Sequence, residues 1–235
     1  STQGITIDAN TILVKDTGLD VYYAGGAVAV TSNVFENIKG STVCCKGNGI
    51  NVNNSSATGG PDDVITSITL QSNTIKQFNA GLYFDGSDRT ILSSVSSNTI
   101  TDSEDRGMYV TRVQGTSITG NTVTGSRNGG VYLQSAVPSV FKDNVITGNG
   151  TTSNGPAAIN QPGLLISHSN AELSESFLIE DNDLSGNGIG IELREFANVV
   201  IKGNDLSGST SYGLNNLTTN AIDARYNYWG LVETT

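Results

Sequence analysis

Apolar and polar residues alternate over short stretches along most of the chain, and these stretches recur at a nearly constant spacing. Residues 95–110, VSSNTITDSEDRGMYV, show one copy of the repeated unit. The unit is an apolar residue, two spacers, an asparagine, one spacer, a second apolar residue, a polar turn, and a glycine that begins an alternating apolar segment. The alternation predicts short β-strands, and the polar, glycine-containing segments between them predict turns.

The asparagine of this unit sets the period of the repeat. Five of the seven intervals between successive copies measure 22 to 25 residues, and the other two measure 40 and 38. Both long intervals contain loop-like insertions that leave the next copy in phase, as a stacked array tolerates because each unit contacts only its neighbours. The repeat therefore predicts an all-β parallel solenoid in which equivalent positions stack from coil to coil. The asparagines are Asn33, Asn73, Asn98, Asn121, Asn144, Asn182, Asn204 and Asn227.

The repeat predicts one domain over residues 1–235, with about nine or ten coils of 22–25 residues. We expect residues 1–26 to form an N-terminal coil or cap, residues 27–230 to form the repeats, and residues 231–235 to form a tail. Loops should project from insertions near 53–66, 147–162 and 168–176. Ser1 is not an initiating methionine, so we expect the sequence to be part of a longer protein.

Two columns of equivalent positions are apolar throughout and should face the core. They lie three residues before and two residues after each asparagine. Burying such side chains contributes about 1.5–3 kcal/mol each, more than any surface pairing. The second column ends at Trp229, the only tryptophan, and we predict that Trp229 is a structural cap that covers the open end of the core. The asparagines themselves should form a ladder of side-chain amides at a tight turn.

The strand that follows each glycine defines the outward face, because alternate side chains point away from the core. One outward column should contain Asn51, Tyr83, Tyr109, Tyr132, Leu165, Glu192 and Asn215, and the next Asn53, Asp85, Thr111, Gln134, Ser167 and Arg194. Three stacked tyrosines suit the apolar faces of sugar rings, with phenol hydroxyls left for hydrogen bonds. We therefore predict substrate binding by Tyr83, Tyr109, Tyr132, Asn51 and Asn215. The alternative is that the stacked tyrosines pack only on each other.

Composition and charge narrow the class of partner. The chain has 22 acidic and 12 basic residues, a net charge of −10, so it lacks the basic surface that nucleic acid requires. No apolar run approaches the roughly 20 residues of a membrane span. Cys44 and Cys45 are adjacent, which disfavours a bond between them, and we expect free thiols.

Several charged residues have structural explanations. Lys142, Glu180, Lys202 and Arg225 share one column and should form exposed ion pairs, and Glu104 and Arg127, 23 residues apart, should meet between neighbouring coils. Surface pairs of this kind contribute about 0–1 kcal/mol. His168 is the only histidine and lies beside an insertion, so we expect it to be exposed rather than to act as a general base.

The glycine-apolar-tyrosine-apolar strand and the apolar-x-x-Asn-x-apolar corner resemble the right-handed parallel β-helix repeats of the pectin-lyase-like superfamily. The closing segment IDARYNYWG, residues 222–230, resembles the Asn-x-Trp-Gly end of β-helix regions in bacterial and archaeal secreted and surface proteins. The resemblance covers roughly residues 27–230. It implies a single-stranded right-handed β-helix and polysaccharide binding along the outward sheet. It does not fix the activity, because this fold supports lyases, hydrolases, epimerases and adhesins.

Motifs for chemistry are weak. The candidate catalytic residues are Asp85, Arg112, Glu192 and Arg194, since lyases use a basic side chain beside a neutralised carboxylate. Glu195 should face away from Glu192 and so make a poor glycosidase pair with it. The Asp-Pro-His motif of mannuronan epimerases and the Trp-x-Asp-His motif of pectate lyases are absent. A calcium ion is a further expectation, with oxygen ligands from residues 181–188 or from the PDD segment at 61–63.

Taken together, the sequence predicts a secreted or cell-surface module that engages a polysaccharide or cell-surface glycan along the tyrosine column. Two alternatives stay open. One is a polysaccharide lyase or glycoside hydrolase that acts in the same groove. The other is a structural or adhesive region of a larger surface protein, with other domains as partners.

Overall fold

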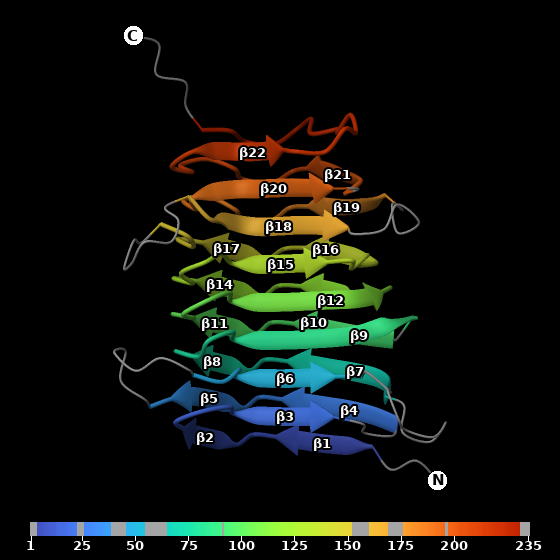
Figure 1. Cartoon of the computed structure of the whole chain (residues 1–235), viewed down its shortest axis with the longest axis vertical. Coiled ribbons are helices and arrows are strands. Elements are labelled where there is room, and N and C mark those ends of the chain that lie inside the picture. The colour runs from blue at the N-terminus through green and yellow to red at the C-terminus, as the bar shows by residue number, and fades with distance from the viewer. Residues whose placement is uncertain are drawn as a thin grey trace.

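A computed structural model describes residues 4–22, 26–38, 46–54, 65–90, 92–151, 160–168, 176–195 and 197–230. Most of the three predicted insertions lies outside the described residues, as do Cys44, Cys45 and the PDD segment at 61–63. The described chain winds into a tall stack of coils, with the two ends of the chain at opposite ends of the stack (Figure 1). The 22 strands of the described residues fall into three sheets that run along this stack.

The first two sheets come early in each coil. Sheet A consists of β1 (Ile5–Asp8), β4 (Gly26–Thr31), β7 (Ile65–Gln71), β10 (Leu92–Ser96), β13 (Ser117–Thr119), β16 (Val140–Lys142), β19 (Phe177–Glu180) and β21 (Val199–Lys202). Sheet B consists of β2 (Thr11–Val14), β5 (Val34–Asn37), β8 (Thr74–Lys76), β11 (Thr99–Thr101), β14 (Thr122–Thr124) and β17 (Val145–Thr147).

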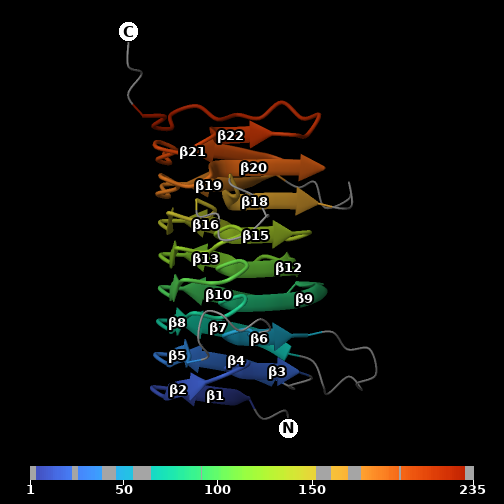
Figure 2. The ribbon, with the colours of Figure 1, turned by 60° about the vertical axis from the view of Figure 1, so that its left-hand side comes forward.

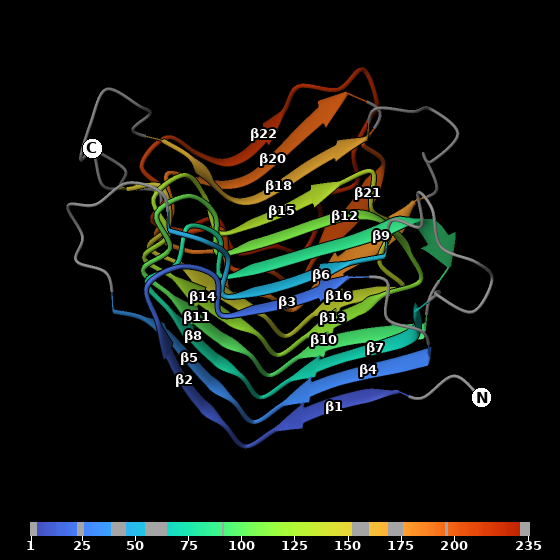
Figure 3. The same ribbon diagram turned by 60° about the horizontal axis from the view of Figure 1, so that its bottom comes forward.

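Sheet C closes each coil and bears the predicted binding face. It consists of β3 (Leu19–Tyr22), β6 (Ile50–Asn53), β9 (Leu82–Thr90), β12 (Met108–Gln114), β15 (Val131–Gln134), β18 (Pro162–His168), β20 (Ile189–Glu195) and β22 (Tyr212–Asn216). The end-on view in Figure 3 shows the three sheets enclosing one interior, and Figure 2 shows the side of the stack.

Every strand pair in these sheets is parallel, and the register follows the repeat. Ile100 on β11 pairs with Ile75 on β8 and with Val123 on β14, and Val123 pairs with Ile146 on β17. Residues 22 to 25 apart therefore lie directly over one another, as predicted. Each of eight coils supplies a strand or bridge to all three sheets, and bridges at Asp223 and Tyr228 begin a ninth.

The predicted inward columns form the core. Their members from Val30 to Ile201 and from Phe35 to Leu206 are at most 1% exposed, whereas Ala224 is only partly buried. Phe78, Phe84 and Met108, which lie outside these two columns, are also fully buried. Stacking thus converts a short apolar segment in each coil into one continuous core, which no single coil could form.

The asparagine ladder is confirmed along the whole stack. The backbone N–H and side-chain amide of each asparagine donate to the side-chain oxygen of the next; Asn98 donates to Asn121 over 3.1 and 3.0 Å, and Asn121 to Asn144 over 3.0 Å in both bonds. The ladder also has a first member that the sequence analysis missed. Asn10 donates to Asn33, which extends the ladder into the coil formed by β1 to β3.

Trp229 lies at the open end of the stack. Tyr228 bridges to Asp205, so that Trp229 falls above Leu206, the last fully buried member of its column. A Cβ atom on Gly213 would lie 3.1 Å from the indole Cε3, which places the ring against that glycine. The side chain is 49% exposed, because no further described coil covers it.

The predicted surface column pairs as expected between sheet A strands. Lys142 lies 3.7 Å from Glu180, and Lys202 lies 3.4 Å from Glu180. Arg225 instead binds Asp223 within its own coil at 2.7 Å, and Glu104 binds the buried Lys46 at 3.0 Å. Among the described residues no helix has the length and hydropathy to cross a membrane.

Candidate functional site

The outward face of sheet C carries an unbroken column of side chains in the predicted register. Asn51 pairs with Tyr83, Tyr83 with Tyr109, and Tyr109 with Tyr132. Beyond the tyrosines, Leu165, Glu192 and Asn215 continue the column to β22. The second predicted column, from Asn53 to Arg194, lies beside it in matching register. All five residues predicted to bind substrate therefore share one face.

The three tyrosine rings contact each other. Tyr109 and Tyr132 are stacked, with ring centroids 5.0 Å apart and planes 22° apart, while Tyr83 meets Tyr109 edge-on at 5.1 Å and 65°. The guanidinium of Arg106 lies over the same rings, 5.6 Å from the centroid of Tyr109 and 4.8 Å from that of Tyr132. The ring faces are thus partly covered by one another and by Arg106. Ring edges and hydroxyls remain available to a ligand.

A local irregularity brings Arg112 to this face. The pairing of β9 with β12 shifts between Thr111 and Val113, and Arg112 adopts a left-handed backbone with φ of 52°. Strict alternation would turn Arg112 inward, but at this bulge its side chain is 43% exposed and pairs with Asp85. Its Nε lies 3.0 Å from Asp85 Oδ1, and a second nitrogen contacts Oδ2. Bulges commonly redirect side chains next to functional sites.

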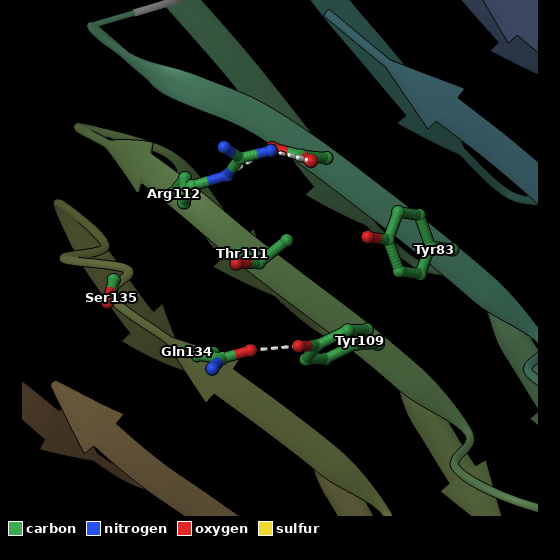
Figure 4. A pocket seen from close by; sticks show the side chains of 7 residues that line it. Tyr83, Tyr109, Thr111, Arg112, Gln134 and Ser135 are labelled. Carbon is green, nitrogen blue, oxygen red and sulfur yellow. Dashed lines mark hydrogen bonds and ion pairs between the residues drawn. The ribbon is translucent and has the colours of Figure 1, made fainter. Parts of the chain in front are cut away.

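The bulge and the tyrosines enclose a cavity of about 280 Å³ on the outward face. Figure 4 shows Arg112, which pairs with Asp85, on one side and the hydroxyls of Tyr83 and Tyr109 on the other. Tyr109 donates a hydrogen bond to Gln134 across the strand gap. Thr111 and Ser135 complete the wall. The cavity therefore offers hydroxyl, amide, carboxylate and guanidinium groups within one opening.

Both tyrosines in the cavity hold their protons more tightly than a free phenol. Burial raises the pKa of Tyr83, and the nearby carboxylate of Asp85 raises it further. Burial also raises the pKa of Tyr109, with a smaller contribution from Tyr132. Each hydroxyl is therefore a neutral hydrogen-bond donor at ordinary pH.

A second polar cluster lies toward the C-terminal end of sheet C. Arg194 pairs with Glu192, whose side chain is only 5% exposed, and Asn215 donates to the other oxygen of Glu192 over 3.0 Å. Glu195 was expected to face away from Glu192. Its left-handed backbone, with φ of 58°, instead lets its carboxylate accept a 2.9 Å hydrogen bond from the outward-facing Ser167.

The first coil extends the site in the other direction, which the sequence analysis did not predict. Asp20 pairs with Asn51 in the register of the outward column. The amide of Asn51 donates to Asp20 and to the hydroxyl of Tyr22, both over 2.8 Å. The signal was present in the sequence, because Asp20 lies ten residues after Asn10, just as Tyr83 lies ten residues after Asn73. Because the sequence analysis assigned the first coil as a cap, it did not extend the outward column to Asp20.

The prediction that His168 is exposed is wrong. His168 is the last residue of β18 and points to the same side as Leu164 and Ile166, so it is fully buried. Its Nε2 lies 3.2 Å from the carbonyl oxygen of Ala136. The sequence analysis placed His168 beside an insertion, but β18 extends through this residue, and the alternation of the strand turns its side chain toward the core.

Residues 181–188, all of which the structure describes, do not support the calcium expectation. Asp183 accepts hydrogen bonds from the backbone and hydroxyl of Ser185, at 3.0 and 2.6 Å. No group of three or more His, Cys, Asp or Glu side chains in the described chain could hold a metal ion. The other candidate, at 61–63, lies outside the described residues.

Comparison with protein families agrees with this geometry. The right-handed β-helix region family matches residues 48–228, which is most of the chain. The protein therefore belongs to the right-handed β-helix family. A search of the curated proteins found no match.

Proposed function

We propose that this protein binds a polysaccharide along the outward face of sheet C, as a secreted or cell-surface module. One observation carries the proposal: an unbroken outward column joins three tyrosines to a 280 Å³ cavity lined by planar polar side chains. Ligand sites typically combine aromatic surface with a few well-placed polar groups, in volumes of about 300–1,000 Å³. The cavity lies near the lower limit, which suits one sugar ring of a longer chain.

The tyrosines support sugar binding through their edges and hydroxyls. Tyr109 and Tyr132 already stack on each other beneath Arg106, so their faces are not free platforms. The hydroxyl of Tyr83 and the Gln134 amide, whose oxygen accepts from Tyr109, border the opening. The planar guanidinium of Arg106 adds a further surface over the rings. A ligand rich in vicinal hydroxyls matches these donors and acceptors better than an apolar one.

The spacing of the carboxylates favours binding over hydrolysis. Asp85 on β9 and Glu192 on β20 are four strands apart, which is roughly 19 Å at about 4.8 Å per strand. A glycosidase needs its two carboxyl groups about 5–9.5 Å apart. Arg112, the candidate lyase base, is held by both oxygens of Asp85. Both features suit a rigid binding surface.

Oligosaccharide binding by tyrosine variants tests the proposal. Tyr109→Ala and Tyr132→Ala should each weaken binding about two- to tenfold, because losing an aromatic contact of about 0.5–1.5 kcal/mol corresponds to that range. Calorimetry against a panel of plant, fungal and bacterial oligosaccharides gives the measurement. Tyr226→Ala is the matched control, since Tyr226 is 83% exposed and lies outside sheet C. Unchanged affinity in Tyr109→Ala and Tyr132→Ala, with folding intact by circular dichroism, would contradict the proposed site.

A further inference from the structure

The charges on the outward face of sheet C point to a particular class of glycan. The face has three arginines with described side chains: Arg106, Arg112 and Arg194. Each of them contacts a carboxylate: Arg106 contacts Asp105 at 3.2 Å, Arg112 contacts Asp85, and Arg194 contacts Glu192. A negatively charged ligand would have to compete with these carboxylates for every guanidinium.

Two of these pairs are difficult to open. The side chains of Asp85 and Glu192 are each only 5% exposed, while their arginine partners are 43% and 48% exposed. Moving either arginine toward a ligand would leave a buried carboxylate without its cation, which is strongly unfavourable. Arg194 can still donate an N–H group to a neutral oxygen without leaving Glu192.

Two further carboxylates add negative charge to the same face. Asp20 lies at the N-terminal end of the outward column and accepts a hydrogen bond from Asn51. Glu195 lies on β20, toward the C-terminal end of sheet C, and accepts a hydrogen bond from Ser167. Both residues are exposed. Among the side chains that the structure describes, they make five carboxylates with Asp85, Asp105 and Glu192, against three arginines, an excess of two negative charges. The whole chain carries a net charge of −10, so the long-range field also repels anions.

The groups that remain for a ligand are neutral. The Tyr83 and Tyr109 phenols are protonated, and Thr111, Gln134 and Ser135 contribute hydroxyl and amide groups. Such groups suit sugar hydroxyls, ring oxygens and acetal oxygens. They provide no uncompensated positive charge for a carboxylate or a sulfate.

We infer that the ligand of sheet C is an uncharged glycan and that polyuronates and sulfated glycans are rejected by the carboxylates of this face. The inference rests on the proposed function, because it names the class of glycan that the same site takes. The carboxylates repel anionic glycans, and the arginines already pair with carboxylates. These two features contribute to the specificity as much as the attractive contacts with the ligand do.

Pairs of polymers that share a backbone, with one member uncharged and the other anionic, provide the test. We would measure binding to hydroxyethylcellulose against carboxymethylcellulose, to methyl-esterified against de-esterified homogalacturonan, and to neutral xylan against glucuronoxylan. In each pair that binds, the uncharged polymer should bind at least about tenfold more tightly than the charged one. The affinity for the uncharged polymer should change little between low and high salt. Tighter binding of the charged member, lost in Tyr109→Ala, would overturn the inference and leave the proposed function intact. Absence of binding to all six polymers would remove the proposed function, and the inference with it.

A double variant isolates the role of the exposed carboxylates. Asp20→Asn combined with Glu195→Gln keeps the hydrogen-bonding shape of both side chains and leaves the Asp85 and Glu192 pairs untouched. At low salt it should raise the affinity for the charged polymers several-fold relative to that for their neutral counterparts. Equal affinities of the variant and the parent protein for carboxymethylcellulose and de-esterified homogalacturonan would show that these carboxylates do not set the specificity.

Discussion

At the scale of single residues, the asparagine ladder fixes each turn between sheet A and sheet B. Asn121 is 1% exposed; its amide donates to the carbonyl oxygen of Val95 at 2.8 Å and to Asn144, and its oxygen accepts two bonds from Asn98. Asparagine suits this place because one short side chain offers both an acceptor and two donors. The oxygen and the amide of the Asn121 side chain are thereby both bonded to protein groups.

Asn121→Ala should therefore destabilise the protein by about 2–4 kcal/mol, because the N–H of Asn98 and the carbonyl of Val95 would be left buried without partners. Chemical denaturation monitored by circular dichroism measures the change. Asn79→Ala is the control, as Asn79 is exposed and should change stability by less than about 0.5 kcal/mol. Equal effects of the two substitutions would show that the ladder does not stabilise the stack.

At the scale of elements, the glycine that begins each strand of sheet C is required by close approach. A Cβ atom on Gly107 would lie 2.1 Å from Cγ1 of Val123 and 2.9 Å from the carbonyl oxygen of Gly130. Gly130 in the next coil meets Gly163 and Ile146 in the same way, at 2.5 Å from each. These glycines let sheet C approach the second inward column, and so they set the position of the tyrosine column.

Gly107→Ala should cost about 1–3 kcal/mol through overpacking against Val123. A double-mutant cycle with Val123→Ala distinguishes this cause from a general loss of strand stability. The double variant should lose less than the sum of the two single losses, since the smaller side chain makes room for the new methyl group. Strict additivity in urea unfolding would mean that the two positions do not touch.

The sequence predicted these elements well because stacking makes the same position repeat in every coil. It predicted less where one coil departs from its neighbours. Arg112 and Glu195 reach the outward face only through left-handed backbone, which their residue types do not signal. Arg106 lies in a turn, and its place over Tyr109 and Tyr132 depends on side-chain packing between coils.

A second ladder was also missed, although its signal was in the sequence. Five residues after the main asparagines come Ser126, Asn149 and Asn187, which are buried. Ser126 N–H donates to Asn149 over 2.9 Å, and Asn149 N–H donates to Asn187 over 2.9 Å. This column was missed because its residue type varies between serine and asparagine, although all its members lie at the turn into sheet C.

At the scale of the whole molecule, a solenoid leaves its core open at each end. Trp229 lies over Leu206 and against Gly213, and half of its surface remains exposed. Trp229→Ala should therefore destabilise the protein by about 1.5–2.5 kcal/mol, roughly half the cost of removing a fully buried tryptophan. Thermal unfolding provides the measurement, with Tyr226→Ala as control. A loss below about 1 kcal/mol would refute the capping role.

The stack as a whole determines what the binding face can recognise. Eight parallel strands present side chains at a constant spacing of about 4.8 Å, from Asp20 on β3 to Asn215 on β22. A polymer of repeating sugars fits such a regular surface, whereas a globular partner would not use its length. The rigid core beneath keeps the tyrosines and the carboxylate–arginine pairs in place, so little order has to be created on binding.

The most direct measurement is nuclear magnetic resonance of tyrosine rings labelled with carbon-13, during titration with the uncharged oligosaccharide that binds best. The sequence has eight tyrosines, so the signals can be assigned by single Tyr→Phe variants. Binding along sheet C predicts that the ring signals of Tyr83, Tyr109 and Tyr132 shift together, while those of Tyr226 and Tyr228, which lie outside sheet C, stay in place. Shifts confined to the C-terminal tyrosines would contradict glycan binding along the outward column.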